Sequence, residues 1–127
     1  MNSQIGVSLV KIASIYMMIG LLIGLIMGLS GNQALATVHS HISLLGWTTM
    51  VITGLVYIVR PGCADSKLAN LYFWLHNIGL PVMVIGLALY YGYGNAQAER
   101  FAGIGSIIVL FSLLIFTINI FKSLKND

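Results

Sequence analysis

The chain has 127 residues, of which 58% are hydrophobic and only 7% are charged; these are too few charges to cover a water-soluble globule of this size, so a membrane is the expected environment. The net charge of +3 does not indicate a nucleic-acid partner, because the basic residues fall at the ends of apolar segments, where they anchor membrane spans. The one cysteine, Cys63, excludes an internal disulfide, and without CxxC or CxxCH motifs there is no indication of a zinc knuckle or covalently attached heme.

Four long apolar runs follow one another, at about residues 5–29, 35–59, 68–91 and 101–121. Each is continuous and long enough to cross the roughly 30 Å core of a bilayer as a helix. Strands of a membrane barrel would instead be about ten residues of alternating character. The sequence therefore predicts an all-α membrane protein, a single domain over residues 1–127 that forms a four transmembrane helix bundle.

The positions of the basic residues predict how these helices are oriented. Only Arg100 falls on one side, and the other side has five residues: Lys11, Arg60, Lys67, Lys122 and Lys125. Lys and Arg are enriched in cytoplasmic segments. We therefore expect both termini and the turn at 60–67 on the cytoplasmic side of a bacterial or archaeal cytoplasmic membrane.

The first span carries three glycines at four-residue spacing, Gly20, Gly24 and Gly28. Residues four apart share one face of a helix, so these glycines would let another helix approach closely. We interpret the pattern as a packing signal without chemistry. Lys11, near the inner end of this span, is expected to extend its ammonium group to the lipid headgroups.

The second span places two imidazoles, His39 and His41, near one end of an otherwise apolar segment. At about 100° per residue in a helix, positions two apart point about 200° away from each other. The two rings therefore cannot share one metal and must face different neighbours. An ionisable side chain inside a membrane is a functional-site hypothesis by default, with heme iron as the obvious partner; the alternative is that each ring only hydrogen-bonds across helices.

The helical face below His39 is small near the histidine and comprises Ser43, Gly46, Met50, Gly54 and Tyr57. Small side chains near a histidine leave room for a flat macrocycle, although membrane helices also use them for ordinary packing. Gly46 and Met50 are therefore candidate cofactor-binding residues. Trp47 is expected either to pack or to form a wall of the same pocket.

Aromatic residues at the inner ends of the second and third spans, Tyr57 and the segment 70–74, are expected to anchor the chain at the membrane interface. Further along the third span, Pro81 should kink the helix because it removes a backbone hydrogen bond. His76 has two open interpretations: a structural hydrogen bond, such as one to a carbonyl freed by Pro81, or a third metal-ligand candidate at a cofactor or proton route. A vertical gap on the order of 10 Å between His76 and His41 argues against a single shared metal site.

The turn after the third span ends in Glu99 and Arg100. These two residues could pair with each other, and Arg100 could alternatively attract a heme propionate, because a guanidinium suits carboxylates. The fourth span carries Ser and Thr residues that can bond to their own helix, so we assign it to packing.

Residues 37–61, TVHSHISLLGWTTMVITGLVYIVRP, resemble the tenth transmembrane helix of subunit I of heme-copper oxidases, especially the C-type branch. The segment NLYFWLHNIGL is similar to the start of the eleventh helix there, and together the two cover about half the chain. The features that carry the resemblance are an HxH pair, a Gly-Trp step, and a later Gly, aromatic and Pro: His39, His41, Gly46, Trp47, Gly54, Tyr57 and Pro61.

This resemblance implies a role for each histidine of the pair. In the family, the first histidine is an axial ligand of the high-spin heme and the second of the low-spin heme, which implies that His39 and His41 bind heme b. The chain departs from the family in having no His-His dipeptide for copper and no recognisable His-Tyr cross-link pair. Copper is therefore not expected, and oxygen reduction to water is not supported. His76 falls where the family usually has a nonpolar residue.

The same resemblance implies an assembly. Subunit I has twelve helices in three pseudo-equivalent groups of four, and this chain is similar to one group. A homotrimer would close the same ring. Each copy would then offer His39 to one neighbour and His41 to the other, with up to three bis-histidine hemes at subunit interfaces.

The expected function is that of a b-type cytochrome. Two axial histidines would favour electron transfer with a redox partner, whereas one open iron position would allow binding of oxygen or nitric oxide. Whether the chain is an oxidoreductase is left open. The alternatives are a cofactor-free helper subunit or a small transporter. A transporter would need a membrane-buried carboxylate, but Asp65, Glu99 and Asp127 fall in turns or in the tail.

Overall fold

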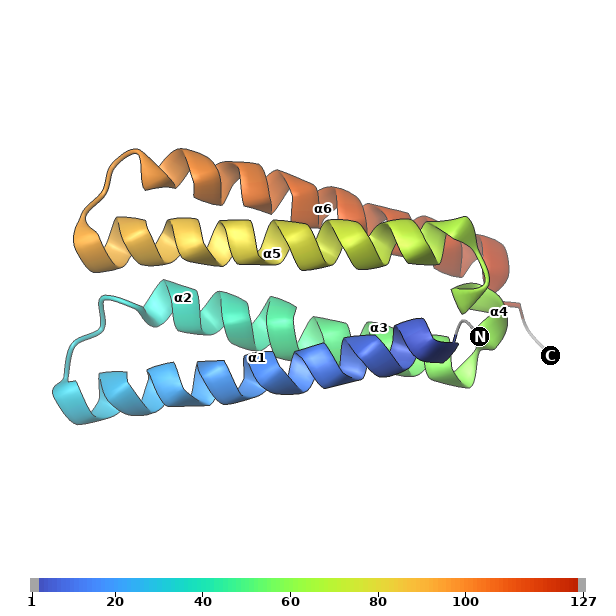
Figure 1. Cartoon of the computed structure of the whole chain (residues 1–127), viewed down its shortest axis with the longest axis horizontal. Coiled ribbons are helices and arrows are strands. Elements are labelled where there is room, and N and C mark those ends of the chain that lie inside the picture. Colours follow the sequence, from blue (N-terminus) through green and yellow to red (C-terminus); the bar gives the residue numbers. More distant parts are fainter. Residues whose placement is uncertain (1–2, 126–127) are drawn as a thin grey trace.

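The computed structural model describes residues 3–125 and contains four long helices with short connections (Figure 1). All four are long and apolar enough to cross a membrane, which confirms the prediction of an all-α chain with four long apolar helices. Asp127, expected in the tail, lies outside the described residues. In chain order the elements are α1 (Ser3–Ser30), α2 (Ala36–His41), the π-helical segment η1 (Ile42–Thr48), α3 (Thr49–Val59), the short α4 (Pro61–Ala64), α5 (Lys67–Tyr93) and α6 (Ala98–Ser123).

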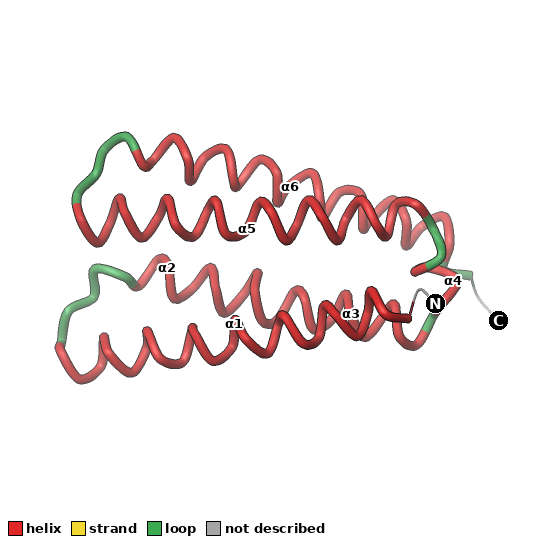
Figure 2. Tube along the Cα trace, in the orientation of Figure 1, coloured by secondary structure: helices red, strands yellow, loops and turns green. Residues whose placement is uncertain are grey.

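The helices form two hairpins that lie side by side (Figure 1). In the first hairpin α1 packs along η1 and α3, and in the second α5 packs along α6 over most of its length. Figure 2 shows that the connections at 31–35 and 94–97 lie at one end of the bundle, which we call the turn end. The short α4 joins the hairpins at the opposite end, where the described chain also begins and ends; we call this the terminal end.

Local sequence signals explain where α5 begins and ends. The Ser66 hydroxyl accepts a hydrogen bond from the Leu68 backbone N–H at 3.1 Å, which satisfies one of the donors left free at a helix start. At the other end Gly94 has a φ of +69°, and its N–H bonds to the Tyr90 carbonyl at 3.1 Å. This left-handed conformation favours glycine. Pro81 lies inside α5, which continues as one helix to Tyr93.

Glycines let α5 and α6 approach until their backbones touch. A Cβ atom on Gly86 would lie 2.5 Å from the Ala102 nitrogen, and a Cβ on Gly105 would fall on the Met83 backbone. No side chain fits at these positions without separating the helices. Small residues at helix crossings are the usual means by which membrane helices pack closely.

The two hairpins meet at the terminal end through large side chains. The rings of Tyr57, Tyr72 and Phe116 form a cluster, with centroids 5.6 Å apart for Tyr57 and Phe116 and 5.3 Å apart for Tyr72 and Phe116. The Tyr72 hydroxyl and Thr53 Oγ1 share a hydrogen bond of 2.9 Å. Tyr57 and Tyr72 are both fully buried, so neither is the interfacial anchor expected from the sequence. They instead join α3 to the second hairpin.

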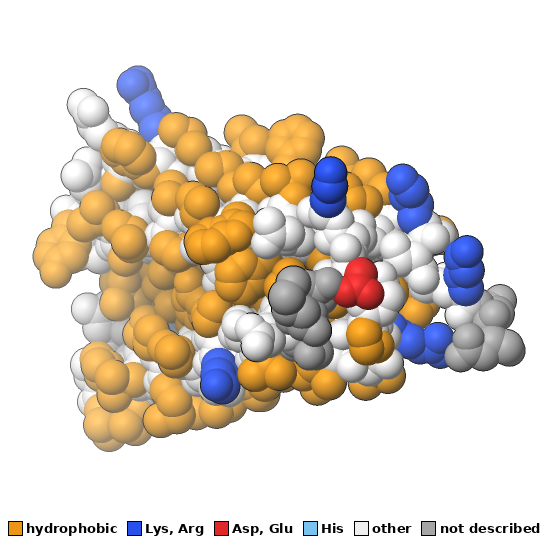
Figure 3. Space-filling view, turned by 45° about the vertical axis from the view of Figure 1, so that its right-hand side comes forward, with side chains coloured by type: hydrophobic (Ala, Val, Ile, Leu, Met, Phe, Trp, Pro, Cys, Tyr) orange, Lys and Arg blue, Asp and Glu red, His pale blue; other side chains and the backbone are white. Residues whose placement is uncertain are grey.

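The outer surface is that of a membrane protein. Hydrophobic side chains cover the flank of the bundle in Figure 3, and Lys and Arg side chains gather near the terminal end. Large apolar residues point outward on all of the long helices, as at Leu25, Ile52, Ile78 and Leu110. Lipid rather than water is the environment in which such a surface is stable.

The close crossing of α5 and α6 is testable by substitution. Gly105→Leu should destabilise the protein by about 1–3 kcal/mol, because the new side chain has to force the two backbones apart. Gly103→Leu is the matched control, since a Cβ on Gly103 meets no atom within 4 Å. Thermal unfolding of both variants in detergent measures the difference, and equal stability would contradict the packing described.

Candidate functional site

His39 lies in α2 with its ring against α1. Its Nδ1 is 2.8 Å from the Gly20 carbonyl oxygen. Because a carbonyl can only accept, Nδ1 carries the proton and donates it, which leaves Nε2 with a free lone pair. The side chain is half-buried. This bond fixes both the tautomer and the orientation of the ring.

Gly24 provides the space that the His39 ring occupies. A Cβ atom on Gly24 would lie 2.9 Å from Cε1 and 3.3 Å from Nδ1 of His39. The spacing of Gly20 and Gly24 predicts close helix packing, and both glycines do lie at close contacts, Gly20 beside Ser43 and Gly24 beside the His39 ring. Gly28 meets no atom within 4 Å and takes no part in this contact.

The Nδ1–H of His41 also donates to a backbone carbonyl, but one in its own helix. Its Nδ1 lies 2.8 Å from the carbonyl oxygen of Thr37, one turn earlier in α2, so here too Nδ1–H donates and Nε2 is left with a lone pair. The ring is half-buried. Within the part of the chain that the structure describes, neither His39 nor His41 has a protein partner for Nε2.

The two rings thus share the arrangement found at histidine ligands of metals, in which Nδ1–H donates to a carbonyl and Nε2 faces the metal. His39 donates to α1 and His41 to its own helix, so the two side chains do not share a partner. The His39 ring faces α1; the neighbour that the His41 ring faces stays a prediction from helix geometry.

The helix changes its hydrogen-bonding pattern directly after the two histidines. Over Ile42–Thr48 it is π-helical, and the Thr49 N–H bonds to the Leu44 carbonyl, five residues earlier. Thr49 Oγ1 donates to the same carbonyl at 2.8 Å. The Tyr16 ring lies against this segment, since a Cβ on Gly46 would be 2.6 Å from its Cγ atom. π-helical turns of this kind often occur at functional sites.

His76 from α5 donates to the backbone of the π-helical segment. Its Nε2 lies 3.0 Å from the carbonyl oxygen of Leu45, a residue inside this segment. Its Nδ1 lies 3.2 Å from Ser112 Oγ. That hydroxyl has a second acceptor, the Val109 carbonyl, at 2.7 Å.

His76 therefore differs from the other two histidines. It is fully buried, and both of its ring nitrogens contact protein groups, so in this conformation neither is free for a metal. The structural hydrogen bond considered for His76 is present, but its acceptor is the Leu45 carbonyl of the first hairpin rather than a carbonyl freed by Pro81. No group of three or more His, Cys, Asp or Glu side chains that could hold a metal occurs within residues 3–125.

The remaining cofactor-binding candidates lie against protein. Gly46 is covered by the Tyr16 ring, Met50 is fully buried in the core, and Trp47 packs partly buried against that core. Arg100, considered for a propionate, is exposed in the first turn of α6 beside Glu99. These assignments to a cofactor remain predictions.

Several residues that build the site carry no signal in the sequence. Ser112 is one of the Ser and Thr residues of the fourth span for which the sequence predicts packing alone, and the Leu45 carbonyl belongs to an ordinary apolar residue. Only the spacing of Gly20 and Gly24 could have indicated a close approach, and the spacing does not reveal that an imidazole fills it.

The bond from His76 to Leu45 is testable through stability. His76→Leu should lose about 1–3 kcal/mol, because the hydrogen bond from His76 Nε2 to the Leu45 carbonyl is lost. His76→Gln should lose less, since its amide can still donate to that carbonyl. Ser112→Ala, which keeps the Leu45 bond and removes the hydroxyl that contacts Nδ1 and bonds to the Val109 carbonyl, is the second comparison. Equal unfolding temperatures for the Leu and Gln variants would show that this bond contributes nothing to stability.

Comparison of the chain with known proteins found no homologue. No family model matches the chain, and no significant match was found among curated proteins or among solved structures. The chemistry of the site is therefore argued from its own residues.

Proposed function

We propose that this chain is a heme b-binding membrane protein in which His39 and His41 are axial ligands through Nε2. The observation that supports the proposal is that both rings donate Nδ1–H to a backbone carbonyl, at 2.8 Å in each case, and keep Nε2 free. Bound heme would supply one-electron transfer, or binding of oxygen or nitric oxide if one iron position stays open.

The protein groups around the histidines have defined roles in this proposal. The carbonyls of Gly20 and Thr37 hold the rings in the tautomer that a metal requires, and such hydrogen bonds raise the basicity of the ligating nitrogen. Gly24 leaves room for the His39 ring beside α1. The surrounding apolar helices exclude water, and a dry environment influences the redox potential of a bound heme.

The assembly and orientation form part of the same proposal. A homotrimer would place His39 and His41 of each copy at two different interfaces, with heme between subunits. The excess of Lys and Arg toward the terminal end supports an orientation in which both termini would face the cytoplasm. Light scattering of the heme-loaded protein in detergent should give the mass of a trimer, and a heme-loaded monomer would refute this arrangement.

One observation favours a second function, that of a cofactor-free helper subunit. The His39 bond to Gly20 joins α2 to α1, and the His76 bond to Leu45 joins the two hairpins. Hydrogen bonds of this kind alone can hold membrane helices together. In that case the purified protein would be colourless.

A reduced-minus-oxidised visible spectrum of the purified protein separates the two functions. We expect the absorption bands of a b-type heme, and loss of at least half of the heme in His39→Ala and in His41→Ala, because each variant removes one ligand. His76→Gln is the control and should keep its heme, since the proposal gives His76 no iron to bind. Unchanged heme content in both alanine variants would exclude the assignment.

A pair of glycine variants tests the His39 geometry without removing a ligand. Gly24→Val should displace the imidazole and lower the heme content, whereas Gly28→Val, on the same helix face, meets no atom within 4 Å and should leave it unchanged. Equal heme content in the two variants would contradict the role given to Gly24.

Carbon monoxide added to the reduced protein then distinguishes electron transfer from gas binding. Two histidine ligands predict no change in the Soret band, and a shifted band would show an open iron position.

A further inference from the structure

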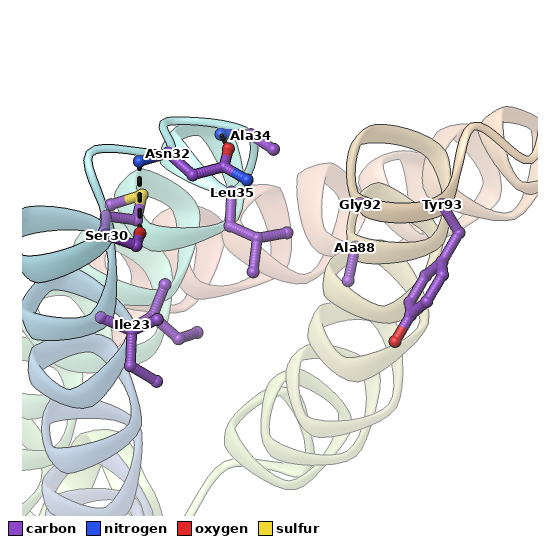
Figure 4. A pocket seen from close by; sticks show the side chains of 10 residues that line it. Ile23, Ser30, Asn32, Ala34, Leu35, Ala88, Gly92 and Tyr93 are labelled. Atoms are coloured by element: carbon purple, nitrogen blue, oxygen red, sulfur yellow. Dashed lines mark hydrogen bonds between the residues drawn. The ribbon is translucent and has the colours of Figure 1, made fainter.

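A cavity of about 440 Å³, open to the outside, lies between the two hairpins at the turn end of the bundle. At the terminal end the space between the two hairpins, which we call the seam, is filled by the cluster of Tyr57, Tyr72 and Phe116. Figure 4 shows Ile23 and Leu35 on one side of the cavity and Ala88, Gly92 and Tyr93 on the other. The volume lies within the range of about 300–1,000 Å³ typical of small-molecule sites.

The walls of the cavity are apolar and carry no charge. Ile23, Ile26 and Met27 of α1 line one side, and Ala88 of α5 lines the other. None of the residues that line the cavity is Lys, Arg, Asp or Glu. A charged ligand would find no counter-ion there, so the cavity suits a neutral molecule.

Three exposed polar side chains line the cavity, Ser30, Asn32 and Tyr93, and Tyr93 is 84% exposed. Ser30 Oγ accepts from the Asn32 N–H at 3.2 Å, and Asn32 Oδ1 accepts from the Ala34 N–H at 2.9 Å. The hydroxyl proton of Ser30 and the Asn32 amide nitrogen therefore remain available as donors, and the Tyr93 hydroxyl is a third potential donor. None of these three side chains donates to another group within residues 3–125.

We propose that this cavity binds the head of a membrane quinone. A quinone is neutral and flat, presents carbonyl oxygens that accept hydrogen bonds, and carries an apolar tail that can remain in the lipid. These properties match a chargeless apolar cavity whose free polar groups are Ser30, Asn32 and Tyr93.

The lining favours a quinone over a phospholipid. A phospholipid headgroup carries a phosphate, and the absence of Lys and Arg from the cavity leaves that anion without a partner. The quinone also suits the position of the cavity beside the histidine site, since Ile23 and Met27 flank Gly24, which contacts His39, on the same helix. The assignment of a redox-active ligand rests on the proposed heme function, whereas binding in the cavity does not.

Calorimetric titration of the purified protein in detergent with a decyl-substituted benzoquinone tests the inference. We expect saturable binding that weakens at least tenfold in Gly92→Leu, because the new side chain would occupy the cavity. A Cβ atom on Gly92 would by itself lie 3.3 Å from Leu35. Tyr93→Phe removes one neutral donor and should weaken binding about 2- to 10-fold. Gly103→Leu, in open space on α6, is the matched control and should bind as the unmodified protein does.

Three results would overturn the inference: no saturable binding, equal affinity in Gly92→Leu and Gly103→Leu, or a tightly retained phospholipid, detected by native mass spectrometry, that the quinone does not displace. The titration does not depend on iron. Quinone binding by protein that contains no heme would therefore refute the proposed function alone, and a heme protein without quinone binding would refute only the assignment of the cavity.

Discussion

The structure depends on one constraint, that a polar group inside a bilayer must find its partner within the protein. Three imidazoles meet it by donating to backbone carbonyls, at Gly20 for His39, at Thr37 for His41 and at Leu45 for His76. The three rings differ in whether the second ring nitrogen also has a protein partner. In His76 it contacts Ser112, whereas in the other two rings it is left with a free lone pair.

The seam between the hairpins divides the molecule into a packed half and an open half. At the terminal end bulky rings fill it, and Thr53 bonds to Tyr72 across it. At the turn end the lining residues Ala88 and Gly92 are small, and a cavity remains. The glycines that position His39 belong to the same half of α1 as this cavity. His39 and the cavity therefore lie toward the turn end, and the large aromatic side chains fill the space between the hairpins at the terminal end.

Much of this arrangement was predictable from the chain itself. Continuous apolar runs of bilayer length predicted four helices, because backbone groups in lipid can be satisfied within a helix. Helical periodicity alone predicted that His39 and His41 face different neighbours. The expectation that Tyr57 is an interfacial anchor was wrong, because an aromatic residue near the end of one helix does not show which neighbouring helix covers it.

The sequence by itself determined the environment, the number of spans and the two histidines that stand out in an apolar segment, because these follow from local composition and helix geometry. The tertiary structure decided which atoms the rings meet. Leu45 and Ser112 become partners of His76 only when η1, α5 and α6 pack together. The space beside Gly24 is filled by the His39 ring only when α2 packs on α1. Contacts between residues distant in sequence depend on packing between helices, which the pattern within one helix does not encode.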